Sequence, residues 1–253
     1  MKILFLIPSL NFGGTERQVI ILTKELAKLG NNVIVGYFYD GPLLKNTDSK
    51  YVKFRKIEIS NRKSPIVIFK IASLISRENP DIVQTFLSYM DIFGGLASFI
   101  LNKPFVLSER SNGINEADKK IIIFLKSLIL NLSGTIICNS IYGKKFWMKT
   151  SPKSNVIFIP NIVKKSIDQK VKKVFSTSNF KILVLSRFNE HKNTLLTVEI
   201  FCEHQKTFPE SEFIFVGDGD NLENCIAYVK KNSIDKKQFK FIGFKKYVKK
   251  YFL

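Results

Sequence analysis

The feature of this sequence that most constrains its fold is a regular alternation of short apolar runs with longer segments of helical spacing. The first cycle is typical: an apolar run at 2–7 precedes residues 16–29, in which Val19, Leu22 and Leu26 recur on one helical face. Gly30 follows as a C-cap. Alternation of this kind favours a parallel sheet with helices packed on it. We therefore predict an α/β fold with a doubly wound parallel sheet.

Further cycles follow the first one. Additional strands are predicted at 32–38, 82–83, 105–107, 135–138 and 156–159. Additional helices are predicted at 66–76, 91–101, 118–132 and 142–149. A polar, lysine-rich stretch without periodicity then interrupts the pattern.

The interruption divides the chain into two predicted domains. Residues 1–160 form the first domain, 161–179 a linker, and 180–253 a second domain. In the second domain the alternation resumes with strands at 181–186, 212–216 and 239–242 and helices at 194–206 and 221–232. A full doubly wound sheet has about six strands, so we expect this domain to be incomplete and the chain to be truncated.

Charge and composition narrow the possible partners. The net charge of +19 accompanies 45% hydrophobic residues, enough for real cores. Because the basic excess is spread over both predicted domains, we expect no nucleic-acid binding. A diffuse positive charge fits attraction to an acidic membrane surface better.

Cysteine, histidine and hydropathy patterns indicate the compartment. The three cysteines show no C-x-x-C spacing, and two histidines are too few for a histidine-based metal site, so we expect no metal or cofactor. The N-terminal apolar run is too short for a signal peptide. The run 121–132, interrupted by Lys126 and Ser127, is too short to span a bilayer and is interpreted as a buried or membrane-facing helix. We expect a cytoplasmic protein with peripheral contact at the inner face of the cytoplasmic membrane.

Two basic residues lie where the first strand of the second domain meets its helix. Arg187 follows the apolar run 182–185, and Lys192 comes just before the helical spacing begins. Ligands bind at this edge of open α/β sheets. A cation beside a helix N-terminus is unfavourable unless an anion is held there too, and a phosphate or diphosphate is the natural candidate. The alternative is a pair of solvated basic residues in a lysine-rich protein.

Other strand-to-helix loops carry weaker signals. Gly13 and Gly14, followed by Thr15 as a possible N-cap, would let a backbone approach a ligand, as would Gly217 and Gly219. Each pair is equally compatible with a simple turn.

Polar residues also follow two strands of the first domain. Glu109 and Arg110 close one strand and could face a cleft or form a solvated ion pair. Gln84, Phe86 and Tyr89 could line an acceptor pocket or belong to the core.

Six short motifs occur in a fixed order along the chain. They are Gly-Gly at 13–14, Asn-Pro-Asp-Ile-Val at 79–83, Ser-Glu-Arg-Ser at 108–111, Ile-Pro-Asn at 159–161, Ser-Arg-Phe…Lys at 186–192 and Phe-Val-Gly-Asp-Gly at 215–219. Together they resemble family 4 glycosyltransferases. The resemblance implies a GT-B fold, in which two Rossmann-like domains face each other across a cleft. The N-terminal domain takes the acceptor and the C-terminal domain the nucleotide-sugar donor.

The resemblance also implies roles for individual residues. Arg187 and Lys192 would neutralise the donor diphosphate without an obligatory metal ion, as catalytic and donor-binding residues. The remaining donor-binding residues would be Gly13, Gly14, Gly217 and Gly219, and the acceptor-side residues Gln84, Glu109 and Arg110. The family transfers the sugar with retention of anomeric configuration, here to a glycan or lipid-linked acceptor in cell-surface polysaccharide synthesis.

The sequence departs from the family pattern at two places. Gln84 and Phe86 stand where many members have histidines, and no pair of glutamates separated by seven residues follows Gly243. That pair holds the donor sugar in the family, so we expect this polypeptide alone to be inactive or severely impaired. The alternatives are a non-catalytic binding module or one half of a split enzyme.

Overall fold

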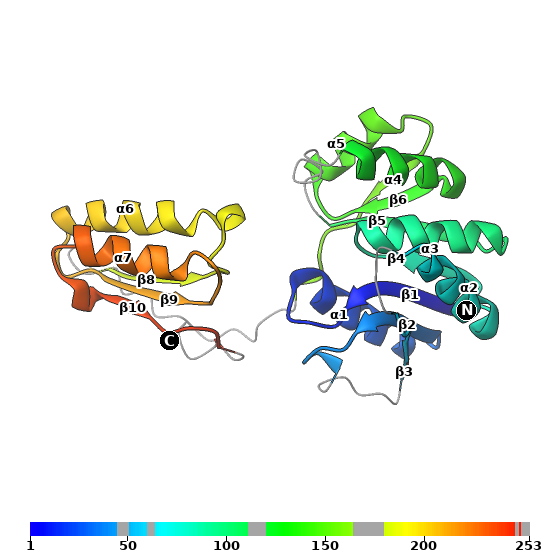
Figure 1. Ribbon diagram of the computed structural model, residues 1–253, viewed down its shortest axis with the longest axis horizontal. Helices are drawn as coiled ribbons and strands as arrows, with labels where there is room; N and C mark the ends of the chain where they lie inside the picture. Colours follow the sequence, from blue (N-terminus) through cyan, green and yellow to red (C-terminus); the bar gives the residue numbers. More distant parts are fainter. Residues whose placement is uncertain (45–50, 60–63, 111–119, 164–179, 246–247, 249–253) are drawn as a thin grey trace. The chain divides into compact units, whose positions relative to one another are not determined.

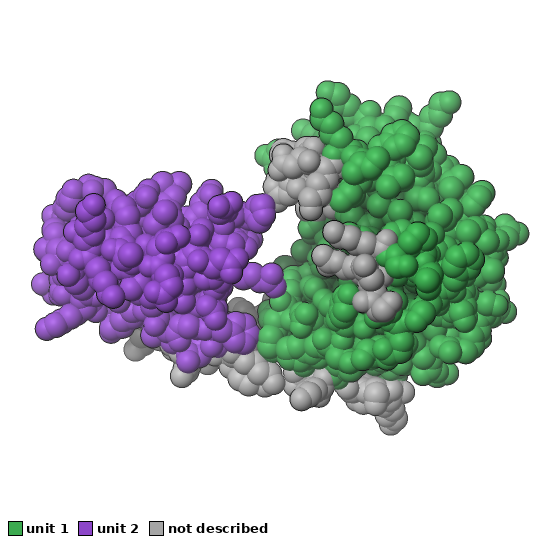
Figure 2. Space-filling model, in the orientation of Figure 1, with its two compact units in different colours: residues 1–165 green, residues 166–253 purple. Residues whose placement is uncertain are grey.

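The computed structural model describes residues 1–44, 51–59, 64–110, 120–163, 180–245 and 248. The chain divides into two compact units, residues 1–165 and 166–253, which are considered separately (Figure 2). The predicted linker, 161–179, lies for the most part outside the described residues.

Unit 1 is built on a parallel sheet of seven strands (Figure 1). Its strand order is β3-β2-β1-β4-β5-β6-β7. The strands are β1 (Lys2–Ser9), β2 (Asn32–Tyr39), β3 (Val52–Lys56), β4 (Ile82–Thr85), β5 (Phe105–Glu109), β6 (Thr135–Cys138) and β7 (Asn155–Phe158). Strand order reverses at β1, whose neighbours are β2 and β4. This reversal is the mark of a doubly wound sheet.

Helices cover both faces of this sheet. They are α1 (Gly14–Lys28), α2 (Ile66–Glu78), α3 (Ser88–Ile100), α4 (Lys120–Ser133) and α5 (Ile141–Thr150). Alternate residues of β1 point to opposite faces. Leu4 and Leu6 pack in the core under α2, α3 and α4, whereas Phe5 and Ile7 pack with Val19 of α1. The prediction of a doubly wound α/β sheet is therefore confirmed.

Strand β3 is an element that the sequence pattern did not predict. Its five residues, Val52–Lys56, include three basic side chains, so no apolar run marks it. Only Val52 is buried, because β3 is the edge strand and pairs with β2 alone. Backbone pairing with β2, rather than hydrophobic periodicity, defines this strand.

Unit 2 repeats the same plan on a smaller scale. A parallel sheet of order β10-β9-β8 is formed by β8 (Lys181–Leu185), β9 (Glu212–Val216) and β10 (Phe239–Phe241). The connecting helices are α6 (Thr194–Thr207) and α7 (Leu222–Asn232), with short 3-10 turns η3 (Glu190–Lys192) and η4 (Lys236–Gln238). Figure 1 shows both helices on one face of the sheet. The described part of this unit thus contains the three strands that the sequence predicts.

Local chain signals set several element ends. Gly30 has a φ of 83° and ends α1, as predicted, with its N–H bonded to the Ala27 carbonyl. At the other end of α1 the N-cap is Gly13, not Thr15, which lies inside the helix. The predicted N-cap role of Thr15 is therefore wrong: the helix begins earlier than the apolar periodicity does.

Candidate functional site

The carboxyl edge of the unit 1 sheet borders a cavity of about 210 Å³. Because all strands run parallel, the residues that follow them gather at one edge, where α/β proteins bind ligands. The cavity is lined by Gln18, Leu22, Leu26, Gln84, Arg110, Ile137, Ile159, Pro160 and Ile162. Its walls are mostly apolar, and three long polar side chains contribute the hydrogen-bonding groups.

Gln18 ties helix α1 to the segment that follows β7. Its side-chain amide donates to the Ile162 carbonyl at 2.9 Å and its amide oxygen accepts from the Ile162 N–H at 2.7 Å. This pair of bonds joins residues 144 positions apart. Gln18 therefore holds two walls of the cavity together, a role that no local sequence signal marks.

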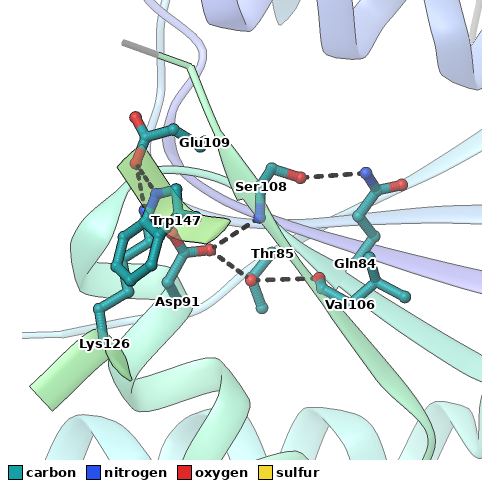
Figure 3. Close-up of polar contacts among 8 residues, drawn as sticks. All are labelled: Gln84, Thr85, Asp91, Val106, Ser108, Glu109, Lys126 and Trp147. Atoms are coloured by element: carbon teal, nitrogen blue, oxygen red, sulfur yellow. Dashed lines mark hydrogen bonds and ion pairs between the residues drawn. The ribbon is translucent and has the colours of Figure 1, made fainter. Parts of the chain in front are cut away.

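Gln84 and Arg110, two predicted acceptor-side residues, line this same cavity. The Gln84 amide nitrogen donates to Ser108 Oγ at 3.0 Å (Figure 3). That bond fixes the amide between adjacent strands β4 and β5, so the orientation of Gln84 does not depend on a ligand.

Arg110 is the charged group of the cavity. Its guanidinium lies over the Phe86 ring, 4.9 Å from the centroid, and its Nη1 donates to Asn161 Oδ1 at 3.4 Å. Burial lowers the pKa of Arg110 from its usual value, yet an arginine stays charged. The Nε atom is buried and makes no hydrogen bond within the described part of the chain. An incompletely satisfied, partly desolvated cation of this kind can bind an anionic ligand strongly.

Phe86 and Tyr89 do not line the cavity. Phe86 is fully buried and stacks on Phe5 with a centroid distance of 5.6 Å. Tyr89 packs on the ring of Phe93. Phe86 therefore belongs to the core, and it affects the cavity only through its contact with Arg110.

Glu109 differs from the expectation of a residue that faces the cleft. Its side chain is 2% exposed and turns into the core between α4 and α5 (Figure 3). Its Oε2 accepts hydrogen bonds from Lys126 Nζ at 3.1 Å and from Trp147 Nε1 at 2.9 Å. Glu109, the last residue of β5, thus points into the core, whereas Arg110, the next residue, lines the cavity.

Lys126 connects Glu109 to a second buried acid. Lys126 Nζ lies 2.8 Å from Asp91 Oδ2, and both side chains are almost completely inaccessible. The other Asp91 oxygen accepts from Thr85 Oγ1 at 2.5 Å. We name Asp91, Glu109, Lys126 and Trp147 the buried charge cluster. It joins α3, α4, α5 and β5 directly behind the cavity edge.

The buried charge cluster holds two carboxyls and one ammonium. Desolvation raises the pKa of Asp91 above its ordinary value, against the opposing effect of Lys126. Two negative charges sharing one buried cation are costly, so a raised pKa is expected for one of them. Burial also raises the pKa of the neighbouring Cys138 thiol to about 12, which rules it out as a nucleophile near neutral pH.

Gly13 and Gly14 lie where β1 leads into α1, as predicted. A side chain on Gly13 would collide with the Glu16 carboxylate, whose Oε2 lies 2.0 Å from the position of an ideal Cβ. Glu16 also accepts a hydrogen bond from Ser9 Oγ at 3.4 Å. A carboxylate therefore stands at the helix N-terminus, and contact of these glycines with a donor stays a prediction.

In unit 2, Arg187 and Lys192 lie between β8 and α6, also as predicted. Both are exposed. Asn189 Oδ1 accepts from the Lys192 N–H at 3.2 Å and closes the turn η3, and α6 begins two residues later at Thr194. The N-cap of α6, Asn193, makes no capping hydrogen bond through its side chain to any described residue. The first amides of α6 are thus available to an anion.

Gly217 and Gly219 are required by a close approach of two loops. An ideal Cβ on Gly217 would lie 1.8 Å from the Ser186 carbonyl oxygen, and one on Gly219 would lie 2.3 Å from the Phe188 carbonyl oxygen. The Phe188 N–H donates to the Asp218 carbonyl at 3.0 Å. The glycine loop therefore packs against the segment that carries Arg187, and the two loops form one surface at the end of the sheet.

A shallow depression of about 590 Å³ lies beside this surface, lined by Asp218, Gly219, Asp220, Leu222 and Glu223. Its carboxylates are hydrogen-bond acceptors suited to hydroxyl groups.

Among the described residues, no group of three or more His, Cys, Asp or Glu side chains is placed to hold a metal ion. No described helix is long and apolar enough to cross a membrane.

A protein-family model matches most of unit 1. Residues 12–166 match the model described as Glycosyltransferase Family 4. The match covers more than half of the chain and includes both the Gly13–Gly14 loop and the cavity. A search of curated protein sequences gives no match.

Solved structures share the fold. HepE of Anabaena, crystallised with UDP and glucose, superposes with a TM-score of 0.76 at 19% identity over 97% of this chain and 70% of its own. A glycosyltransferase of Rickettsia africae gives 0.67 at 23% identity over 98% and 69% of the two chains. Sucrose-phosphate synthase of Thermosynechococcus elongatus gives 0.70 at 14% identity over 96% and 70%.

Proposed function

Because this chain belongs to glycosyltransferase family 4, we propose that it takes part in the transfer of a sugar from a nucleotide-sugar donor to a glycan or lipid-linked acceptor in cell-surface polysaccharide synthesis. The reaction breaks the bond between the anomeric carbon and the donor phosphate, and a bond to an acceptor hydroxyl forms with retention of configuration. We place this reaction at the inner face of the cytoplasmic membrane.

The observation that carries the proposal is the arrangement at the start of α6. Arg187, Lys192 and the uncapped amides of α6 gather positive charge where β8 ends. A diphosphate would relieve the unfavourable meeting of Lys192 with the helix dipole. The adjoining Gly217–Gly219 loop packs directly against this segment, because its two glycines place no side chain between the two loops. HepE, which shares the fold, was crystallised with UDP.

The same charges suit the chemical step. As the glycosidic bond breaks, negative charge builds on the departing nucleoside diphosphate, and fixed cations stabilise that charge more than they stabilise the ground state. Arg187 can bind two phosphate oxygens at once, whereas Lys192 acts as a point charge.

The cavity of unit 1 supports an acceptor with both apolar and anionic parts. Its aliphatic walls would hold the apolar part, and the guanidinium of Arg110 would bind a phosphate or carboxylate. Gln84 supplies an amide oxygen for an acceptor hydroxyl. Glu109 accepts hydrogen bonds from Lys126 and Trp147 inside the core, so we assign it no contact with the acceptor.

Nucleotide binding tests the donor site. We expect calorimetric titration of the full chain with UDP and with GDP to detect binding of one of them. Arg187→Ala should weaken that binding about ten- to hundredfold, because a charge-assisted hydrogen bond to phosphate is lost.

The matched control is Lys231→Ala, which removes one exposed cation from the far end of α7. It should leave the affinity unchanged within about twofold. If neither nucleotide binds at millimolar concentration, or if both variants weaken binding equally, the proposed donor site is wrong. Retention is tested separately by the anomeric configuration of the first-formed product.

A further inference from the structure

The buried charge cluster and the cavity of unit 1 meet at the same strand ends. Glu109, a member of the cluster, immediately precedes Arg110, the charged residue that lines the cavity. Asp91 reaches these strand ends from α3. Its Oδ1 accepts from Thr85 Oγ1 at the end of β4 at 2.5 Å and from the Ser108 N–H of β5 at 3.4 Å (Figure 3). The charges of the cluster therefore lie where they can act on the cavity.

The cluster contains more negative than positive groups. Asp91 and Glu109 share one ammonium, Lys126 Nζ, at 2.8 and 3.1 Å, and the three side chains are at most 2% exposed. When both carboxyls are ionised, one negative charge is left without compensation inside the cluster. Water screens such a charge poorly, so it acts on its surroundings.

Arg110 is the cation on which this excess charge acts. Burial lowers the pKa of Arg110, and among the charges that raise it again Asp91 has the largest effect, ahead of Cys138 and Glu109. The guanidinium of Arg110 is thus compensated from inside the protein. An anionic ligand in the cavity competes with Asp91 for the same positive charge.

The β/α architecture does not need these charges. The described buried residues of unit 2, which follows the same plan, include no charged side chain. Buried ion pairs can often be replaced by apolar side chains without loss of stability. We therefore look for the role of the cluster in the cavity rather than in the packing of the sheet.

We propose that Asp91 determines how strongly the cavity prefers an anionic ligand: its carboxylate compensates Arg110 until an anion binds there, and Asp91 then takes up a proton. The inference rests on the proposed function, in which Arg110 binds the anionic group of the acceptor. The proton comes from the solvent and bonds to a carboxyl oxygen of Asp91, and no other bond forms or breaks. Nearby negative charges disfavour each other's ionisation, so the bound anion promotes this protonation.

Asp91 is the carboxyl of the cluster that we expect to take up the proton. Desolvation raises the pKa of Asp91, against the opposing effect of Lys126. Its hydrogen-bond donors are a neutral hydroxyl and a backbone N–H. Glu109 instead accepts from the ammonium of Lys126 and from Trp147 Nε1, and both bonds stabilise its ionised form.

The other titratable and charged groups around Arg110 do not offer a competing proton site near neutral pH. Burial raises the pKa of Cys138 on β6 to about 12, with smaller effects of Glu109, Lys126, Arg110 and Lys144 of α5. Histidine is the side chain that ordinarily titrates between about pH 5 and 8. Both histidines of the chain, His191 and His204, belong to unit 2.

Calorimetric titration of the full chain with 1-hexanesulfonate tests this inference. The probe combines a short apolar chain with one negative charge, and its sulfonate does not titrate near neutral pH, so an exchanged proton belongs to the protein. Titration in two buffers of different ionisation enthalpy gives the number of protons exchanged. We expect uptake of up to about one proton per bound anion and, by linkage, an affinity that falls as the pH rises through the pKa of Asp91. This measurement needs no variant.

Asp91→Asn removes the charge at nearly constant size. It should bind hexanesulfonate about three- to tenfold more tightly than the parent near pH 8, because Arg110 is no longer compensated, and it should take up no proton. A purely structural role of Asp91 has the opposite sign, since a distorted cavity binds more weakly. The matched control is Glu25→Gln, which removes an equal charge from an exposed position on α1 and should change the affinity by less than about twofold.

Arg110→Gln separates this inference from the proposed function. If binding depends on Arg110 but the parent takes up no proton and Asp91→Asn binds no more tightly, the inference is wrong and the acceptor cavity stands. If the parent does not bind hexanesulfonate at millimolar concentration, or Arg110→Gln binds it equally well, the anionic part of the acceptor cavity and the inference are both wrong. Nucleotide binding by unit 2 is measured without hexanesulfonate and remains a separate test.

Discussion

The two units of this protein share a plan but differ in what fills their interiors. The described buried residues of unit 1 include three charged side chains, Asp91, Glu109 and Lys126. Those of unit 2 include none, and its buried polar side chains are Thr194, Gln205 and Ser211. The same β/α architecture is thus held by a buried ionic network in one unit and without one in the other.

Unit 2 is filled by phenylalanine rings instead. Phe213 stacks on Phe201 at 4.7 Å and meets Phe239 at 4.8 Å, and Phe215 stacks on Phe241 at 4.9 Å. Aromatic packing gains energy from area and ring geometry and is insensitive to pH. A buried ion pair contributes little net free energy to folding stability. Removal of one partner nevertheless destabilises the fold severely, because the other charge stays buried without a counterion. The two interiors should therefore respond differently to substitution and to pH.

Removal of the buried cation should have the largest effect. Lys126→Met leaves Asp91 and Glu109 buried without their ion-pair partner and should destabilise unit 1 by about 3–5 kcal/mol. Trp147 is the single tryptophan and lies in the buried charge cluster, so its fluorescence during urea unfolding reports on unit 1 alone.

The control for this measurement is Lys145→Met on exposed α5, which should change the unfolding free energy by less than about 0.5 kcal/mol. A loss below 1 kcal/mol for Lys126→Met would show that the carboxyls do not depend on the lysine. Addition of Asp91→Asn and Glu109→Gln should recover part of the loss, because no unpaired charge remains.

Replacement of a phenylalanine ring should destabilise unit 2 by less than Lys126→Met destabilises unit 1. Phe213→Leu keeps an apolar side chain but loses the contacts with Phe201 and Phe239, and should cost about 1–2 kcal/mol. The buried thiols of Cys202 and Cys225 lie in the same core. Their labelling rate by a thiol reagent should therefore rise several-fold or more.

Cys138 supplies the reference for unit 1, because it is buried in the other core. Its labelling should not change in Phe213→Leu. Phe244→Leu, at a position 53% exposed, is the matched control and should alter neither rate. Equal acceleration at all three cysteines would mean that the two units open together and that the contrast between their interiors has no separate consequence.

The smallest of the three effects should be the dependence of the unfolding free energy of unit 1 on pH. The pKa of Asp91 is raised by burial, so in the folded chain this carboxyl takes up a proton at higher pH than in the unfolded chain. Its protonation contributes stability that is fully present below the unfolded pKa and is lost as pH rises through the folded pKa. Asp91→Asn removes this titration.

Urea unfolding followed through Trp147 at several pH values measures the effect. The unfolding free energy of the parent minus that of Asp91→Asn should be larger near pH 4 than near pH 7. A difference that grows as pH rises would show that Lys126 lowers the pKa of Asp91 after all, and that desolvation does not dominate.

Local patterns predicted most of the fold and one part of the candidate site. The helices and the strands with apolar runs were predictable because periodicity is a property of neighbouring residues. Strand β3 was not predictable, because Lys53, Arg55 and Lys56 interrupt any apolar run in it. It is an edge strand defined by its pairing with β2. Arg187 and Lys192 were placed correctly because their position depends only on where β8 ends and α6 begins.

The direction of Glu109 could not be predicted. Its partners Lys126 and Trp147 lie 17 and 38 residues away in sequence. A charged residue beside Arg110 after a strand has the same local pattern whether it faces solvent or the core. Gln18 is a similar case, since its contact with Ile162 forms only once α1 and the end of β7 meet.

The sequence by itself therefore determined the order of the strands and helices other than β3, the family of the chain and the position of the basic pair in unit 2. All of these follow from short-range spacing of apolar residues, glycines and charges. Only the tertiary structure decided which charges of unit 1 are buried and which line the cavity. The physical reason is that burial is a property of pairs of elements, and parallel strands bring together residues that no local window contains.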